Sequence, residues 1–350
     1  MIIRTKAYGR AGLIGNPSDG FFGKTISIIL RNFAAEVTCY ESPGLVIVPG
    51  HRDHLAFESR AALVEDVQRN GYYGGVRLIK ASIRAFSDYC RLHGIALDRR
   101  NFTIAYQTTI PVRVGLAGSS GIITATMRAL MDFYGVEIPK PQLPTLILRV
   151  ETDELGIGAG LQDRVIQVYE GVVFMDFARE IMEQQGYGAY EHLLPEQLPP
   201  LFVAYHDNLA EGTEVTHNDL HSRFRRGEPE VVEAMQGFAA YARQARDLLV
   251  DGRGEEIGPL MDANFDLRAR ICPISPGNRR LVETGRALGA SVKFSGSGGA
   301  VIGQYDGDPE RIERLREAYA AFGARLIVPL VEPELDQRGK SEPGVLMHET

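Results

Sequence analysis

A run of small residues at 111–122, P-V-R-V-G-L-A-G-S-S-G-I, has the composition of a backbone segment that could hold a phosphate group. The pattern predicts a strand that leads into a loop of Gly, Ala and Ser, with a helix that opens on the two serines. Small side chains let a ligand approach the backbone closely, and the N–H groups and positive dipole of a helix start attract anions. An ordinary strand-to-helix turn with a serine N-cap would have the same composition, so spacing alone leaves both interpretations open.

A second Gly-Ser segment, F-S-G-S-G-G-A at 294–300, lies near the other end of the chain. The wider pattern V-K-F-S-G-S-G-G-A-V-I-G at 292–303 predicts a strand, a glycine turn and a second strand. A tight hairpin is the simpler interpretation of this segment by itself. Its interest is that it could face the first loop across a cleft.

Extended segments alternate with longer amphipathic ones around these loops, which predicts a mixed α/β or α+β protein. A strand at 101–110 precedes the first loop, and helices are expected at 76–93 and 120–134. Three prolines within 189–200 indicate a connection between domains, because Pro disrupts both a helix and an inner strand. Beyond it we expect a strand at 201–205, helices at 229–250, 255–271, 276–288 and 308–322, and a strand at 324–331.

Length and composition set the limits of these expectations. A chain of 350 residues favours two domains, which we expect at 1–195 and 196–335, with a tail at 336–350. The formal net charge of −7, without a basic block, argues against nucleic acid as a general partner. Three scattered cysteines suit a reducing compartment, and no apolar run approaches the roughly 18 residues that span a bilayer. We therefore expect a cytoplasmic monomer or homodimer with no membrane partner.

Three blocks resemble motifs of the GHMP small-molecule kinases and follow that family's order. They are A-Y-G-R-A-G-L-I-G-N-P-S-D at 7–19, P-V-R-V-G-L-A-G-S-S-G at 111–121 and V-K-F-S-G-S-G-G-A-V at 292–301. Between them, E-T-D-E-L-G-I-G-A-G-L-Q-D at 151–163 matches the segment with the family's metal-binding Glu and catalytic Asp. Within the family, the strings G-N-P-S-D, A-G-L-Q-D-R-V, N-F-D-L-R and K-F-S-G-S-G-G-A-V look like plant-type glucuronokinases.

The resemblance covers about residues 4–330 and implies an α+β, two-domain GHMP kinase fold. Its N-terminal domain would be a βα nucleotide-binding domain, and its C-terminal domain a ferredoxin-like α/β domain. Two positions depart from the family pattern. Gly121 replaces the usual Ala, which is a conservative change, and Asn16-Pro17 stands where most sugar kinases of the family have Glu-His. The second departure makes it unsafe to infer the substrate from galactokinase-like members.

The resemblance also implies ATP and Mg²⁺ as cofactors and assigns the site residues. Asp163 matches the catalytic Asp, and Arg10 matches a basic residue that would keep it ionised; outside the motif such a pair is more simply a structural salt bridge. Glu151 and Ser120 would hold Mg²⁺, with Ser119 as the alternative to Ser120. The residues expected to bind the ATP phosphates are Gly115, Leu116, Ala117, Gly118, Ser119, Ser120, Gly296, Gly298 and Gly299.

The activity implied is phosphorylation of a sugar hydroxyl, with D-glucuronate converted to D-glucuronate 1-phosphate as the leading expectation. Asp19 matches a residue that accepts a sugar hydroxyl, although turn chemistry in N-P-S-D-G explains it almost as well. A sugar acid needs a cation for its carboxylate; Lys24, Arg164 and Arg268 are candidates, each with a surface or ion-pair alternative. The other interpretations are a galacturonate, heptose, fucose or mevalonate-type kinase, and a non-catalytic ligand sensor on the same fold.

Overall fold

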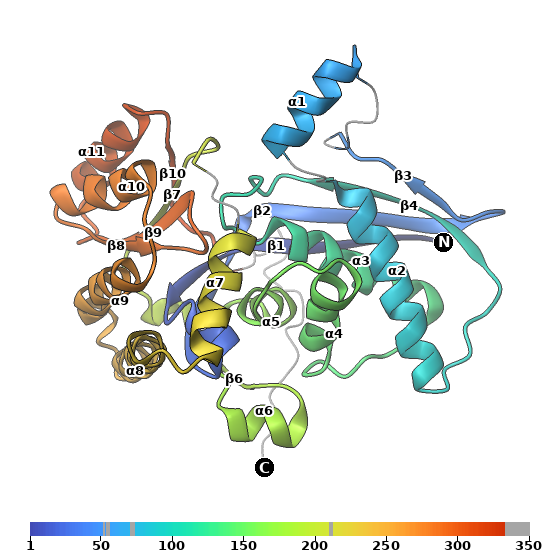
Figure 1. The fold of residues 1–350 in the computed structure, drawn as a ribbon, viewed down its shortest axis with the longest axis horizontal. Helices are drawn as coiled ribbons and strands as arrows, with labels where there is room; N and C mark the ends of the chain where they lie inside the picture. Colours follow the sequence, from blue (N-terminus) through green and yellow to red (C-terminus); the bar gives the residue numbers. More distant parts are fainter. Residues whose placement is uncertain (52, 54–56, 71–73, 210–212, 333–350) are drawn as a thin grey trace, which may run out of the picture.

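The computed structural model describes residues 1–51, 53, 57–70, 74–209 and 213–332. These residues form a six-stranded and a four-stranded sheet with helices around both (Figure 1). The mixture of helices and largely antiparallel strands confirms the α+β expectation. The expected tail at 336–350 lies outside the described residues.

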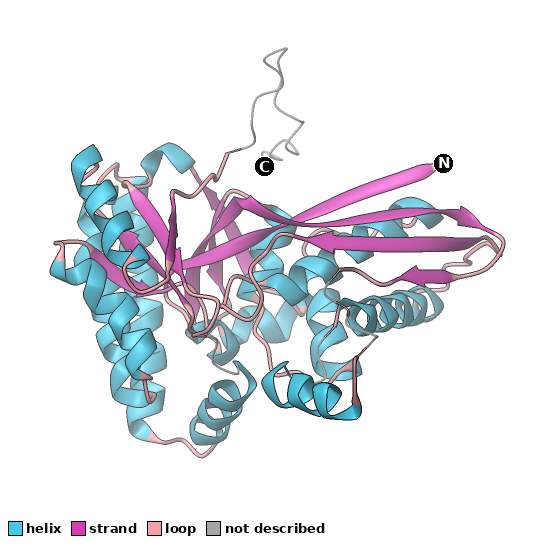
Figure 2. Ribbon diagram, turned by 90° about the horizontal axis from the view of Figure 1, so that it is seen from above, coloured by secondary structure: helices cyan, strands magenta, loops and turns pink. Residues whose placement is uncertain are grey.

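The six-stranded sheet is built on two long antiparallel strands, β1 (Ile2–Ile14) and β2 (Lys24–Ser42), which run across the molecule (Figure 2). The outer half of β1 alternates between exposed and buried residues, whereas its inner end is buried almost throughout. A strand covered on both faces reads as a continuous run of small and apolar residues, as Gly9–Ile14 does apart from Arg10. The other strands of this sheet are β3 (Val46–Val48), β4 (Asn101–Thr108), β5 (Val172–Asp176) and β6 (Ala189–Leu193).

The N-terminal half also contains six α-helices among its described residues. The elements are α1 (Arg60–Asn70), α2 (Gly75–Leu92), α3 (Gly118–Tyr134), α4 (Leu143–Arg149), α5 (Gln162–Tyr169) and α6 (Arg179–Gln185). Of these, α3 and α5 pack against the two long strands. In Figure 1, α1 lies on one side of the long strands and α2 to α5 lie on the other. The predicted helices at 76–93 and 120–134 correspond to α2 and α3, because their apolar residues recur at helical spacing and Gly94 and Gly135 follow their ends.

The four-stranded sheet has the order β10-β7-β9-β8 and is antiparallel throughout. Its strands are β7 (Leu201–Tyr205), β8 (Ser291–Phe294), β9 (Ala300–Gln304) and β10 (Arg325–Ile327). The helices around it are α7 (Thr213–Arg225), α8 (Pro229–Val250), α9 (Gly258–Ile271), α10 (Pro276–Ala287) and α11 (Pro309–Ala320). The helices α7 to α10 lie between β7 and β8 in the chain, β8 leads directly to β9, and α11 lies between β9 and β10. This chain order, with β7 and β9 central in the sheet, is ferredoxin-like, as expected.

The proline-rich segment 189–200 differs from the expectation in its first part. Residues 189–193 form β6, which pairs with β5, because Pro195 and the later prolines all follow the strand. The two sheets also share one core, since a single cluster of buried side chains contains Ile26 of β2 as well as Val203 and Ile302 of β7 and β9. The boundary between 195 and 196 stays a prediction.

Candidate active site

Arg10 and Asp163 form an ion pair at the inner end of β1. Arg10 Nε donates to Asp163 Oδ1 at 2.7 Å, and their side chains are 5% and 19% exposed. Arg10 is held by the buried half of β1, and Asp163 stands in the first turn of α5. The greater exposure of the carboxylate leaves it accessible to a ligand, while the guanidinium is closed off from water.

The same arginine joins the two Gly-Ser segments. Its Nη1 donates to the Gly115 carbonyl at 2.5 Å and to the Ser295 carbonyl at 3.2 Å. Gly115 has φ +70°, and a Cβ there would lie 2.9 Å from the Gly298 carbonyl oxygen. The two segments therefore contact each other through their backbones, which corrects the expectation that they would face each other across a cleft.

The first loop turns into α3 without a serine cap. Ala117 is the N-cap residue, has a left-handed φ of 64° and makes no side-chain capping bond. The helix begins at Gly118, ahead of both serines, and Ser120 Oγ donates back to the Ala117 carbonyl at 3.2 Å. The serine-capped turn considered as the alternative is therefore wrong, and a left-handed Ala of this kind is a costly conformation that surrounding contacts must hold.

Glu151 lies opposite the first serine, on a π-helical turn, Val150–Glu154, that follows α4. Its carboxylate is buried, accepts a hydrogen bond from Ser119 Oγ at 2.7 Å and pairs with Arg164. Single π-turns within helices occur frequently at functional sites. Of the two serines considered as partners of Glu151, the geometry brings Ser119 to it, while Ser120 is 99% buried against its own loop.

Asp19 completes an acidic group with Asp163. It is buried at 9% exposure, and its Oδ2 accepts a hydrogen bond from the Gln162 backbone N–H at 3.2 Å. Burial, together with the nearby charge of Asp163, raises the pKa of Asp19 to about 6. Gln162, the residue before Asp163, makes this contact through its backbone, so no side-chain pattern in the sequence points to it.

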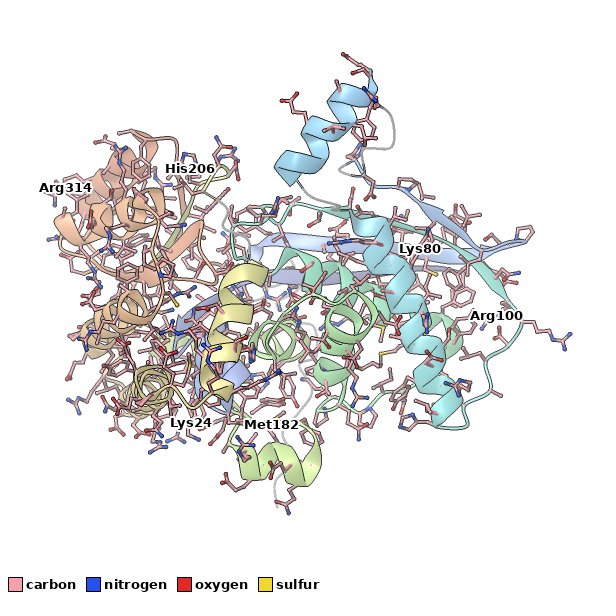
Figure 3. The ribbon with its side chains drawn as sticks, in the orientation of Figure 1. Lys24, Lys80, Arg100, Met182, His206 and Arg314 are labelled. Atoms are coloured by element: carbon pink, nitrogen blue, oxygen red, sulfur yellow. The ribbon has the colours of Figure 1, made fainter. Side chains whose placement is uncertain are left out.

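The three candidate cations have different surroundings. Lys24, which is labelled in Figure 3, pairs with Asp176 where β2 meets β5. Arg268 donates to the carbonyls of Gly296 at 2.8 Å and Ser297 at 3.1 Å, so it supports the second Gly-Ser turn.

Arg164 is the cation that the structure brings to the acidic group. Its Nη1 lies 3.5 Å from Asp163 Oδ2 and donates to the Gly160 carbonyl at 2.7 Å, while Nη2 pairs with Glu151. Its Nε is buried without a hydrogen-bond partner among the described atoms. Burial, reinforced by the charge of Arg10, lowers the pKa of Arg164 to about 9.

Comparisons with known proteins agree with this geometry. The pattern of the GHMP kinases N terminal domain matches residues 77–171, which include the first loop, Glu151 and Asp163. The chain belongs to the GHMP kinase family.

Two relatives in that family are similar over most of the chain. Glucuronokinase 1 of Arabidopsis thaliana is 39% identical over 331 residues, 93% of this chain and 91% of the relative. Probable glucuronokinase 2 of the same plant is 40% identical over 324 residues, 90% of this chain and 88% of the relative. The crystal structure of Lactococcus lactis galactokinase complexed with galactose has a TM-score of 0.74 at 14% identity, covering 94% of this chain and 93% of that one. A likeness at that identity shows the shared fold.

Two further features of the described residues concern a membrane and a metal ion. In the part of the chain that the structure describes, no helix is long and apolar enough to span a membrane. The described residues also contain no group of three His, Cys, Asp or Glu side chains that could hold a metal ion by themselves.

Proposed function

We propose that this chain is an ATP-dependent sugar 1-kinase that transfers a phosphoryl group to the anomeric oxygen of D-glucuronate. The observation that carries the proposal is the Arg10 side chain, which bonds Asp163 and the backbones of both Gly-Ser segments at once. This arrangement puts a carboxylate beside a backbone suited to polyphosphate. The two Arabidopsis thaliana relatives named glucuronokinase support the choice of substrate.

The ATP phosphates would lie along Gly115–Ser120 and against Gly296, Gly298 and Gly299. Backbone N–H groups and the start of α3 would supply the hydrogen bonds and the positive potential. Arg10 and Arg268 bond carbonyl oxygens of the two segments and thereby hold both backbones in place. Catalysis of phosphoryl transfer rests mainly on such positioning and on electrostatic stabilisation.

Asp163 would accept the proton of the sugar hydroxyl while the oxygen of that hydroxyl forms a bond to the γ-phosphorus. The bond from that phosphorus to the bridging oxygen breaks, and ADP leaves with the electron pair. Arg10 favours the ionised form of Asp163 and offsets charge on the transferring group. Asp19, next to Asp163, would accept a hydrogen bond from a second sugar hydroxyl and fix the orientation of the ring.

Glu151 and Ser119 fit a Mg²⁺ ion that also contacts nucleotide phosphates, since Mg²⁺ prefers one or two carboxylates together with phosphate and water oxygens. We base this fit on the hydrogen bond between Ser119 Oγ and Glu151 Oε1, because oxygens 2.7 Å apart are close enough to contact one ion. When bound, the ion neutralises charge on the phosphate oxygens. Glu151 would exchange its pairing with Arg164 for the ion, which frees a guanidinium edge beside Asp163.

Arg164 is the residue that we propose for the carboxylate of the sugar acid. It adjoins Asp163, its Nε has no partner among the described atoms, and a planar guanidinium can bind both carboxylate oxygens. Lys24 is neutralised by Asp176, and Arg268 is engaged with the turn at 296–297. These engagements favour Arg164 over the other two candidates.

The test is ADP release with D-glucuronate, D-galacturonate, glucose and galactose under identical ATP and Mg²⁺, followed by identification of the sugar phosphate. We expect glucuronate to give the highest kcat/KM and a product phosphorylated at the anomeric oxygen. A preference for galacturonate would keep the carboxylate site and contradict the stereochemistry. Turnover of heptose, fucose or mevalonate alone would favour another kinase of the family, and ATP binding without turnover of any acceptor would favour a sensor.

A further inference from the structure

Lys293 of β8 is a buried cation to which the proposed chemistry gives no role. Its side chain is 1% exposed, although lysine is among the residues least often buried. The ammonium nitrogen Nζ lies 2.8 Å from the Gly12 carbonyl, 2.5 Å from Asn16 Oδ1 and 2.7 Å from the Phe294 carbonyl. All of these partners are neutral oxygen atoms.

The number of acceptors matches a protonated lysine. An ammonium group has three N–H donors, and each of the oxygens around Nζ can take one of them. Burial, together with the charges of Arg268 and Arg10, lowers the pKa of Lys293 well below its usual value. The three acceptors act against that lowering, because a neutral amine would leave one of them without a donor.

The partners of Lys293 belong to two segments far apart in sequence. Gly12 and Asn16 precede Asp19, whereas Phe294 begins the second Gly-Ser segment. Other bonds join the same segments, since the Gly12 N–H donates to the Ser295 carbonyl at 2.8 Å.

Asn264 of α9 adds a further pair of bonds to this network. Its Oδ1 accepts from the Gly15 N–H at 2.7 Å, and its Nδ2 donates to the Asn16 carbonyl at 3.1 Å. The turn that leads to Asp19 is thus bonded to the C-terminal half mainly by buried polar side chains.

We propose that Lys293 is a positioning residue that holds the turn carrying Asp19 in register with the Gly-Ser turn at 295–299. This inference rests on the proposed function, in which Asp19 orients the sugar and the Gly-Ser turn binds the nucleotide. Lys293 would then set the distance between the acceptor hydroxyl and the γ-phosphate without touching either one. A small error in that distance reduces kcat strongly, whereas each ligand alone still finds its own site.

Lys293→Met is the direct test, because methionine is similar in length and cannot donate hydrogen bonds. We expect kcat to fall on the order of 10²-fold, while the KM values for ATP and for the sugar change by less than about threefold. The kinetics use whichever acceptor the wild-type protein phosphorylates. A wild-type preference for another acceptor would therefore contradict the proposed substrate without affecting the ratio of variant to wild type.

Tyr319→Phe is a matched control within the same half of the molecule. It removes the buried hydrogen bond from Tyr319 OH to the Leu281 carbonyl at 2.8 Å, away from the Gly-Ser turns. We expect its melting temperature to fall while kcat of the folded protein is unchanged. A Lys293→Met protein that behaves like this control, with a lower melting temperature and kcat within threefold of wild type, would overturn the inference.

Amide hydrogen exchange gives a readout that needs no acceptor. In Lys293→Met, segments 12–19 and 294–299 should both exchange faster, while exchange in α11 stays as in wild type. Faster exchange in only one of the two segments would mean that Lys293 does not join them.

If Lys293→Met does not fold, Asn16→Ala is the second variant, because it removes one of the acceptors of Lys293. It should give the same exchange pattern with a smaller loss of kcat. Unchanged kcat and unchanged exchange in Asn16→Ala would also contradict the inference.

Discussion

Arg10 and Asp163 are separated by 153 positions in the chain, yet Nε of the arginine lies 2.7 Å from Oδ1 of the carboxylate. The other edge of the same guanidinium bonds the Gly115 and Ser295 carbonyls. One side chain therefore ties the proposed base to both proposed phosphate-binding backbones. Arginine can do this because its donors are held in one plane and point in several directions.

Asp163→Asn should abolish turnover while nucleotide binding persists. The amide has nearly the volume of the carboxylate but cannot take the proton, and loss of a base costs on the order of 10²–10⁴ in rate. Steady-state kinetics give kcat, and titration calorimetry with ATP and Mg²⁺ gives the nucleotide Kd. A variant with more than about half of the wild-type kcat would contradict the role of Asp163.

Ser119→Ala should raise the Mg²⁺ concentration needed for half-maximal rate, because Ser119 is the serine that contacts Glu151. Ser120→Ala is the matched control, since the Ser120 hydroxyl donates to the Ala117 carbonyl of its own loop and not to Glu151. Glu151→Gln should shift the Mg²⁺ requirement in the same direction as Ser119→Ala. A Ser120→Ala variant with the larger shift would return the metal to Ser120.

Arg164→Gln should remove the preference for a sugar acid over the neutral sugar. Pairing a buried cation with a carboxylate discriminates by several kcal/mol, on the order of 10³-fold in kcat/KM. Glucuronate and glucose are compared in wild type, Arg164→Gln and Lys24→Met, and Lys24→Met should keep the preference because Lys24 pairs with Asp176. A preference lost only in Lys24→Met would move the carboxylate site to β2.

Asp19→Asn should stabilise the protein at pH 8 and reduce its activity. The pKa of Asp19 rises from 3.8 to about 6 on folding, so the native state holds its proton more tightly than the unfolded state. The wild-type free energy of unfolding should therefore fall as pH rises from about 3.8 to 6, by about 3 kcal/mol in total. Urea unfolding at pH 4 and pH 8 measures this difference, which Asp19→Asn should remove. If Asp19→Asn changed the free energy of unfolding equally at both pH values, the raised pKa of Asp19 would be contradicted.

The sequence by itself determined the elements whose signals are local. The helix at 229–250 and the strand at 201–205 have the predicted bounds, because a proline marks the helix start and a short apolar run defines the strand. Motif order along the chain was also enough to indicate the family and to select Arg10, Asp163, Glu151 and Asp19. These features depend on residue type and spacing, and both can be read from the sequence alone.

Tertiary structure decided which of these side chains meet. Ser119 rather than Ser120 contacts Glu151 because α3 begins at Gly118 after a left-handed Ala117. The residue types alone do not indicate this backbone conformation. The partner of Lys24 lies 152 positions away in the chain and depended likewise on how distant strands pack.

Lys293 and Asn16 give the clearest case. Both stood in strings that resemble the glucuronokinases, but their contact spans 277 positions of the chain. Buried polar groups must find partners wherever the fold places them, and long-range packing rather than local pattern selects those partners.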